Sequence, residues 1–287
     1  NHSIWTTLAI LSSIATISMY TETMLLPALP QLIDEFDLSY NNSSWILSAY
    51  LVAGAVMTPV SGKLSDIYGK KKIMIILISI YTIGLIISPF SSNFFMLLMS
   101  RILQGIGISV FPVTFGLVRE HFPREKLAIS QGIISSMFAG GSVLGLAIGG
   151  TIVQFYDWRL TFFSIIPIAI CLLIIIMRFI PTEKKATKGS IIKNDNSYEK
   201  FDLRGSILLG VSIITFLLFI TFLKTESFVT SDKLLNSLRV PITSLFCLTV
   251  FILSFVAFLL FERKTKFPLI ASSLFFDRRI LSSNIIL

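Results

Sequence analysis

Two charged side chains stand out because each interrupts a long apolar run. Glu22 lies within the run Trp5–Leu29, and Arg101 lies within the run Phe94–Val118. A charge at the centre of a bilayer costs at least about 2.5–3.5 kcal/mol, so charges that persist there usually have a function. A buried carboxyl holds its proton tightly, and a nearby guanidinium loosens it. We hypothesise that Glu22 binds and releases a proton and that Arg101 tunes its affinity. A fixed ion pair, or an arginine that only satisfies backbone carbonyls, is the alternative.

The two charges are expected at a similar depth. Glu22 precedes Pro30 by eight residues, and Arg101 follows Asn93 by eight. At 1.5 Å per helical residue, both lie roughly 12 Å from the outer ends of their helices. Contact between the two side chains is therefore possible.

The composition indicates that these runs cross a membrane. The chain is 54% hydrophobic and 14% charged, with a mean hydropathy of +0.82, whereas soluble domains carry about 25% charged residues. A bilayer core is about 30 Å thick and needs roughly 20 apolar residues per helix. Eight stretches qualify: Trp5–Leu29, Ser44–Ser61, Ile73–Phe90, Phe94–Val118, Ile129–Phe155, Thr161–Ile180, Gly205–Leu223 and Val240–Phe261.

Lysine and arginine are concentrated in alternate connections between these stretches. The basic connections are residues 62–72, 119–126 and 181–204. Because basic loops remain on the cytoplasmic side, this alternation predicts the orientation of every span. We expect a multi-pass plasma-membrane protein with both ends of this chain in the cytoplasm.

Several function classes are disfavoured. The net charge of +8 arises from clusters between apolar runs, so nucleic acid is not an expected partner. The cysteines, Cys171 and Cys247, lie inside apolar runs and do not form a disulfide framework. Neither His2 nor His121 has the spacing of a metal site, and no phosphate-binding loop or nucleophile elbow is present. We expect no enzyme activity, no metal and no cofactor.

The string "GKLSDIYGKKK" is predicted to be a tight cytoplasmic turn between the second and third spans. Gly62 and Gly69 would allow the chain to reverse, and Asp66 would cap a helix N-terminus. The string resembles the loop signature of the major facilitator superfamily, with Ile67 where that signature usually has arginine. The matching residues are Gly62, Leu64, Asp66, Gly69, Lys70 and Lys71.

Two further stretches resemble signatures of the same superfamily. The string "SRILQGIGIS" matches its fourth-helix signature through Arg101, Gln104, Gly105 and Gly107. The fifth helix resembles the antiporter motif, with Leu146 in place of a proline. Glycines four residues apart share one helix face and let another helix approach closely, either for plain packing or between moving helices. The motif residues are Gly132, Gly141, Gly145, Gly149 and Gly150.

The strings "YTETMLLPALP", "FDLRGSILLG" and "FERKTKFPLIASSLFFDRR" resemble the 14-helix drug:proton antiporters of the multidrug and tetracycline efflux type. The tetracycline/proton type within that branch has an acidic residue at the position of Glu22. The resemblance implies an all-α polytopic membrane protein whose C-terminal bundle is missing from this chain. Its parts would be a six-helix bundle of 3+3 inverted repeats (1–180), a cytoplasmic linker (181–204), two extra transmembrane helices (205–261) and a connection into a truncated ninth helix (262–287).

The resemblance implies a secondary transporter that exports hydrophobic or amphipathic drugs in exchange for protons. The proton gradient would supply the energy, with small hydrophobic molecules, protons and lipid as partners, and the complete protein would be a monomer. Tyr20 and Tyr50 are predicted to face the substrate cavity. Few polar residues beyond Glu22, Arg101 and Gln104 are available, which favours an apolar substrate. A proton-coupled or facilitative transporter of a polar metabolite, and a non-transporting sensor or scaffold, are the alternatives.

Overall fold

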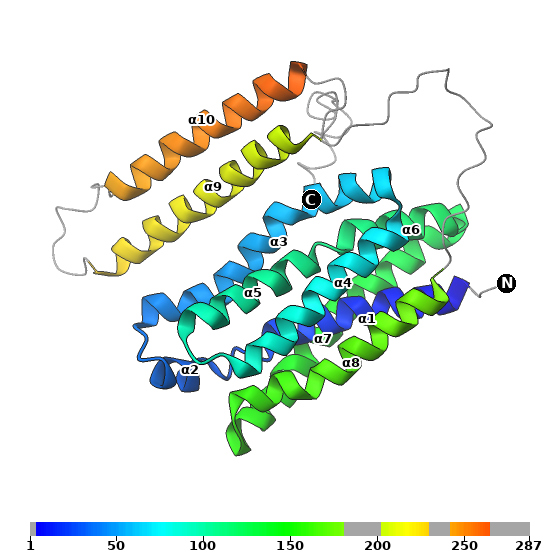
Figure 1. Ribbon diagram of the computed structural model, residues 1–287, viewed down its shortest axis with the longest axis horizontal. Helices are drawn as coiled ribbons and strands as arrows, with labels where there is room; N and C mark the ends of the chain where they lie inside the picture. Colours follow the sequence, from blue (N-terminus) through cyan, green and yellow to red (C-terminus); the bar gives the residue numbers. More distant parts are fainter. Residues whose placement is uncertain (1–3, 181–201, 230–241, 265–287) are drawn as a thin grey trace. The chain divides into compact units, whose positions relative to one another are not determined.

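The computed structural model describes residues 4–180, 202–229 and 242–264, which are helical apart from short connections and contain no strand (Figure 1). Eight of the described segments are long and apolar enough to cross a membrane. The chain divides into two compact units, residues 1–191 and 192–287, and each is described by itself. The predicted all-α polytopic fold is therefore confirmed.

The first unit contains six membrane-length segments. Its elements are α1 (Ile4–Thr23), α2 (Leu29–Glu35), α3 (Tyr40–Tyr68), α4 (Lys70–Ile87) with the 3₁₀ turn η1 (Ser88–Phe90), α5 (Phe94–Ile108), α6 (Phe111–His121), α7 (Arg124–Phe155) and α8 (Trp158–Phe179).

The second unit contains α9 (Leu203–Val229) and α10 (Ile242–Lys264), which pack against each other. Most of the predicted linker, at 181–201, and most of the final connection, at 265–287, lie outside the described residues.

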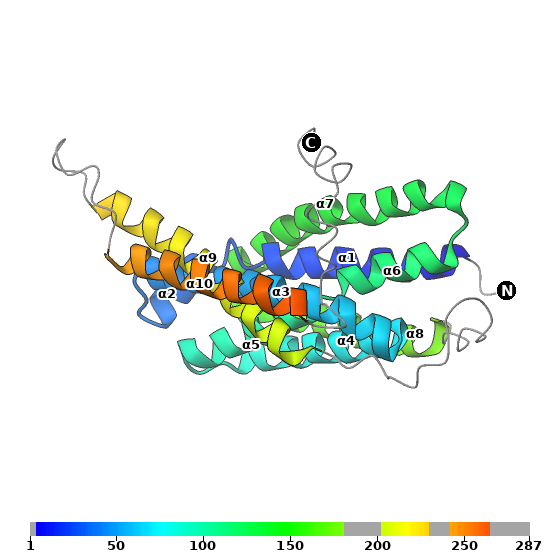
Figure 2. The same cartoon turned by 90° about the horizontal axis from the view of Figure 1, so that it is seen from above.

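Two helix contacts organise the first unit. The helix α1 packs along α7, and α5 packs against both α3 and α4 (Figure 2). Leu11, Ile14, Met74 and Phe162 are among the fully buried side chains of its core. Between membrane-spanning helices such side chains stabilise the contact through van der Waals packing rather than through removal from water.

The α1–α7 contact depends on three of the predicted motif glycines. A Cβ atom added to Gly141 or Gly145 would lie within 3 Å of α1, at Thr16 or Tyr20, and one added to Gly149 would lie within 3 Å of Met24, directly after α1. The hydroxyl of Thr23 lies within hydrogen-bond distance of the Ser142 carbonyl across this contact, at 3.0 Å, and shares its single proton between this carbonyl and that of Met19 on its own helix, at 2.9 Å. The shared glycine face therefore packs inside the first unit. The other two motif glycines are different, because Gly132 faces open space and Gly150 makes only an ordinary contact with Pro27.

The prediction that 62–72 forms a tight turn was wrong in its extent. The helix α3 continues through Gly62 and Asp66 to Tyr68, and only Gly69 breaks it, with a φ of 93° that favours glycine. The lysines then open α4 directly. Asp66 therefore lies in the last turn of α3 and does not cap a helix N-terminus.

Two predicted spans are also interrupted. The first ends at Thr23 rather than Leu29, and the short helix α2 follows a run of turns that contains Pro27. The fourth is divided at Ser109, where the last turn of α5 tightens and α6 begins with Pro112 in its first turn. Proline lacks the N–H group that an unbroken helix would need at these positions.

Candidate functional site

Arg101 is held in the interior of the first unit by the glycines that follow it. A Cβ atom on Gly105 would collide with the backbone of α3 at Tyr50, and one on Gly107 would collide with α4 at Tyr81. Because neither residue has a side chain, α5 approaches both helices closely. Arg101 lies one turn before Gly105 on the same face, and its side chain is 0% exposed.

The guanidinium of Arg101 has three contacts within the described structure. Its Nε donates to the carbonyl oxygen of Ile46 at 3.2 Å, and its Nη1 donates to Oε1 of Gln104 at 2.5 Å. Its Cζ atom lies 4.5 Å from the ring centroid of Tyr50, which is a cation–π contact. Its Nη2 is buried and has no hydrogen-bond partner in the described part of the chain.

Two serines continue this network. Nε2 of Gln104 donates to Oγ of Ser88 at 2.7 Å, and the hydroxyls of Ser88 and Ser100 lie 2.9 Å apart. All three side chains are fully buried. The fourth-helix signature identified Gln104 but neither serine. The available sequence signal for Ser88 is its position before Pro89, where an apolar helix has to end.

Two tyrosines connect this cluster to α1. The hydroxyl of Tyr50 donates to the carbonyl of Ser18 at 3.3 Å, and the hydroxyl of Tyr81 donates to Oγ1 of Thr21 at 2.6 Å. Both tyrosines are buried. The turn of α1 that precedes Glu22 is therefore fixed to α3 and to α4.

Glu22 lies in the last turn of α1 and is partly buried. Its carboxylate interacts electrostatically with Arg101. Its Oε2 atom is buried without a hydrogen-bond partner among the described residues. The ion pairs within 4 Å that the structure describes do not join Glu22 to Arg101. The structure thus brings the two predicted charges into one cluster without a direct ion pair.

The two predicted cavity aromatics lie in helix contacts within this unit. Tyr20 is 7% exposed, and its backbone lies against Gly145 of α7. Tyr50 is fully buried between Arg101 and α1. Tyr50 therefore orients the guanidinium, whereas Tyr20 forms part of the α1–α7 contact.

The loop signature forms a second charged group. Lys70 is 7% exposed and forms ion pairs with Glu120 of α6 and, at 3.5 Å, with Asp66 of α3. The absence of a side chain at Gly116 leaves room for the Lys70 stem. Leu64 packs against the apolar core. Of the predicted loop residues, Lys70 and Asp66 thus connect α3 and α4 to α6.

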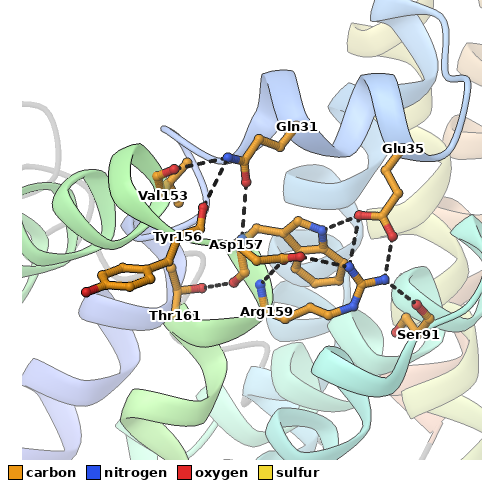
Figure 3. A network of polar contacts seen from close by, with 9 residues as sticks. Gln31, Glu35, Ser91, Val153, Tyr156, Asp157, Arg159 and Thr161 are labelled. Carbon is orange, nitrogen blue, oxygen red and sulfur yellow. Dashed lines mark hydrogen bonds and ion pairs between the residues drawn. The ribbon is translucent and has the colours of Figure 1, made fainter.

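A third polar group surrounds α2 and was not predicted from the sequence. We define the α2 network as Gln31, Glu35, Ser91, Trp158 and Arg159, all of which except Trp158 are labelled in Figure 3. Glu35 accepts from Nε1 of Trp158 at 2.5 Å and from Nη1 of Arg159 at 3.1 Å, and Arg159 also donates to the Ser91 carbonyl at 3.5 Å. Gln31 accepts from the Trp158 backbone N–H at 3.1 Å. The segment that follows Glu22 is thereby attached to α8.

The charges of the α2 network reinforce one another. The hydrogen bonds from Arg159 hold the pKa of Glu35 below its ordinary value, and the opposing effect of burial is smaller. The guanidinium of Arg159 also lies 4.6 Å from the ring centroid of Trp158. Glu35 is therefore a stable carboxylate at neutral pH.

The chain is similar to known membrane transporters. The family model described as Major Facilitator Superfamily matches residues 11–276. "Multidrug resistance protein 3" of Bacillus subtilis (strain 168) is 28% identical over 249 residues, which are 86% of this chain and 45% of that protein. The uncharacterized MFS-type transporter YwoD of the same strain is 30% identical over 257 residues, 89% of this chain and 52% of that protein. The chain thus spans about half the length of these relatives.

Solved structures show the same fold. A bacterial homolog to the human lysosomal transporter Spinster, in an inward-facing and unoccupied conformation, gives a TM-score of 0.57 at 18% identity, covering 93% of this chain and 64% of that one. The human organic anion transporter TETRAN gives 0.53 at 16% identity, covering 88% and 70%. Taken with the family match over most of the chain, these similarities show that the chain belongs to the major facilitator superfamily, whose members are transporters and not enzymes.

Proposed function

We propose that this chain is part of a proton-driven exporter of hydrophobic or amphipathic compounds, in the 14-helix drug antiporter branch. The proposal rests on two buried atoms, Oε2 of Glu22 and Nη2 of Arg101. Glu22 and Arg101 each keep one buried polar atom without a hydrogen-bond partner in the described structure, although their charges interact. A permanent structural pair would use these atoms, because unpaired buried charges are costly.

Glu22 and Arg101 differ in how firmly their side chains are anchored. Arg101 is anchored by Ile46, Gln104 and Tyr50, so its charge stays in place. Glu22 is partly exposed and lacks such anchors, so its carboxyl can gain and lose a proton. Arg101 stabilises the carboxylate form, and a substrate that competes for this carboxylate would couple its own movement to that of the proton.

The burial of the polar side chains in the first unit favours an apolar substrate. Gln104, Ser88 and Ser100 are buried and hydrogen-bonded within the first unit, so they are not available to a hydroxylated substrate. The name of the similar Multidrug resistance protein 3 agrees with export of such compounds. We propose that this export takes place across the plasma membrane, without a cofactor, by a protein that is monomeric when complete.

The test uses the full-length protein in proteoliposomes with an imposed pH gradient. Lipophilic cations and tetracycline-like compounds form the substrate panel, and the Glu22→Gln protein is the matched control. We expect at least one compound to accumulate against its own gradient and to stop accumulating when a protonophore collapses the pH gradient. Accumulation that persists after this collapse would contradict proton coupling.

A further inference from the structure

Beyond the charged pair, the structure assigns a role to Ser88, a residue outside every signature motif. We propose that Ser88 is a positioning residue that fixes the amide of Gln104 and, through it, the guanidinium of Arg101 relative to Glu22. The proposal deepens the proposed function and rests on it for its consequence in transport. Ser88 itself contacts neither Glu22 nor Arg101 in the hydrogen bonds of the described structure.

The hydroxyls of Ser88 and Ser100 each have one proton to donate. Ser100 donates its proton to the carbonyl of Leu97 at 2.7 Å. Ser88 then uses its own proton toward Gly84 O, at 3.0 Å, or toward Ser100 Oγ, at 2.9 Å. A hydroxyl has only one proton. In either arrangement, Ser88 presents only lone pairs to Gln104.

Arg101 and Ser88 favour the same orientation of the Gln104 amide. A lone pair of Ser88 accepts only from the NH₂ end of the amide, which lies 2.7 Å away. The oxygen end must then face Arg101, which has five donors and no acceptor. If the amide turned over, its NH₂ group would oppose the guanidinium. Ser88 therefore stabilises the amide orientation that Arg101 requires, by accepting from its NH₂ end.

The fold keeps Ser88 in place for this role. It follows α4 directly and begins the 3₁₀ turn η1, immediately before Pro89, and its side chain is fully buried. The backbone at Gly84 permits the close approach of α5, because a Cβ atom there would lie 3.0 Å from the Gln104 side chain. The position of Arg101 is thus set by the way α4 ends.

The experiment measures protonation of Glu22 separately from transport. In the full-length protein, a hydrophobic carbodiimide labels protonated carboxyls, and mass spectrometry gives the extent of Glu22 labelling as a function of pH. Ser88→Ala should displace the midpoint of this curve by about half a pH unit or more, because Gln104 no longer holds the guanidinium of Arg101 in one orientation. Ser88→Thr, which keeps the hydroxyl, should restore the wild-type curve.

Two further variants distinguish loss of the Ser88–Gln104 hydrogen bond from a general loss of protein stability. Thr82→Val removes another buried hydroxyl of α4, which bonds only to its own helix at Ile78, and should leave the curve unchanged. Ser88→Cys keeps nearly the same volume with a weak acceptor, so it should displace the curve like Ser88→Ala even if the alanine protein is unstable.

A double-variant comparison tests the route through Gln104. Gln104→Ala should displace the curve in the same direction, and adding Ser88→Ala to it should have no further effect. Displacements that add, or Ser88→Ala and Ser88→Cys curves that coincide with the wild type, would overturn the proposal. If the curve is displaced as expected but transport proves independent of the pH gradient, the proposed function fails while the positioning role stands.

Discussion

Arg101 lies over the face of Tyr50, with its guanidinium carbon 4.5 Å from the ring centroid, and both side chains are fully buried. The ring supplies a desolvated but electron-rich surface, which offsets part of the cost of burying the cation. Because the hydroxyl of Tyr50 also contacts the carbonyl of Ser18 on α1, the same residue supports the arginine and fixes the helix that carries Glu22.

Arg101→Lys tests this geometry. Lysine keeps the positive charge but loses the planar group that contacts the Ile46 carbonyl, Gln104 and the Tyr50 ring together. We expect a folded protein that still transports but whose pH dependence is displaced, measured as substrate uptake into everted vesicles across a pH series. An unchanged pH profile would mean that the position of the charge does not influence the coupling group.

Glu22→Gln tests the proton carrier. Glutamine keeps the shape of the side chain but releases no proton, so accumulation driven by a pH gradient should stop. Substrate–substrate exchange should largely survive, since it moves no net proton. If Glu22 instead stabilises the buried Arg101, its loss should cost roughly 3–5 kcal/mol and reduce expression and both activities together. Normal proton-driven accumulation by a stable Glu22→Gln protein would remove Glu22 from the mechanism.

The sequence predicted the membrane-spanning elements well, because a bilayer imposes a length and an apolar composition on each span. It also singled out Glu22 and Arg101, since a charge in an apolar run is visible without a structure. It overestimated the turn at 62–72, because a glycine that a helix tolerates, such as Gly62, looks the same in sequence as one that breaks it, and only the backbone shows that Gly69 is the break.

The sequence alone did not identify the residues that act through contacts between helices. Ser88 is one of many serines, and its contact with Gln104 depends on how α4 and α5 meet, 16 positions apart in the chain. Glu35 and Arg159 are 124 positions apart, and each alone is an ordinary charge in a short connection. Periodicity and motifs describe single helices, so contacts between helices at this level of detail could not be inferred from them.

The Glu35–Arg159 pair predicts a pH-dependent stability. Its hydrogen bonds lower the pKa of Glu35 in the folded state from the unfolded value of about 4.3. The stabilisation is therefore present above about pH 4.3 and is lost as the pH falls through the folded pKa. Because both side chains are partly exposed, we expect no more than about 1 kcal/mol. Thermal unfolding in detergent should show a smaller loss below pH ~4.3 for Glu35→Gln than for the wild type, and an equal loss would contradict the role of the pair.

The structure also selects the positions at which the predicted topology can be tested. Ser65 is 3% exposed, so a cysteine there would be shielded from reagents on either side of the membrane. Tyr68 and Lys72 are exposed at the predicted cytoplasmic connection, and Asn93 is exposed at a predicted outer one. In intact cells, an impermeant thiol reagent should label a cysteine at Asn93 and not one at Tyr68 or Lys72, in a background without Cys171 and Cys247. The opposite labelling pattern would invert the predicted orientation.

Gly145→Leu tests whether α1 and α7 must stay in backbone contact. Even a Cβ atom at Gly145 would collide with Thr23 and with the backbone of Tyr20, so a leucine must push the helices apart. This separation would break the Thr23–Ser142 hydrogen bond and displace the end of α1 that carries Glu22. We expect proton-driven transport to fall by at least about tenfold, a size that a loss of about 1.4 kcal/mol in the active arrangement would produce.

Gly132→Leu is the matched control, because the same residue change on the same helix meets open space within the described structure. Western blotting of membranes should show both variants inserted, and labelling of a cysteine at Asn93 should report the same topology in both. Transport assays in everted vesicles should then distinguish them, with Gly145→Leu impaired and Gly132→Leu close to the wild type. Unimpaired transport by Gly145→Leu would show that the α1–α7 contact can open without cost. Equal impairment of both variants would instead place an additional functional contact at Gly132, on a face of α7 that the described part of the chain leaves uncovered.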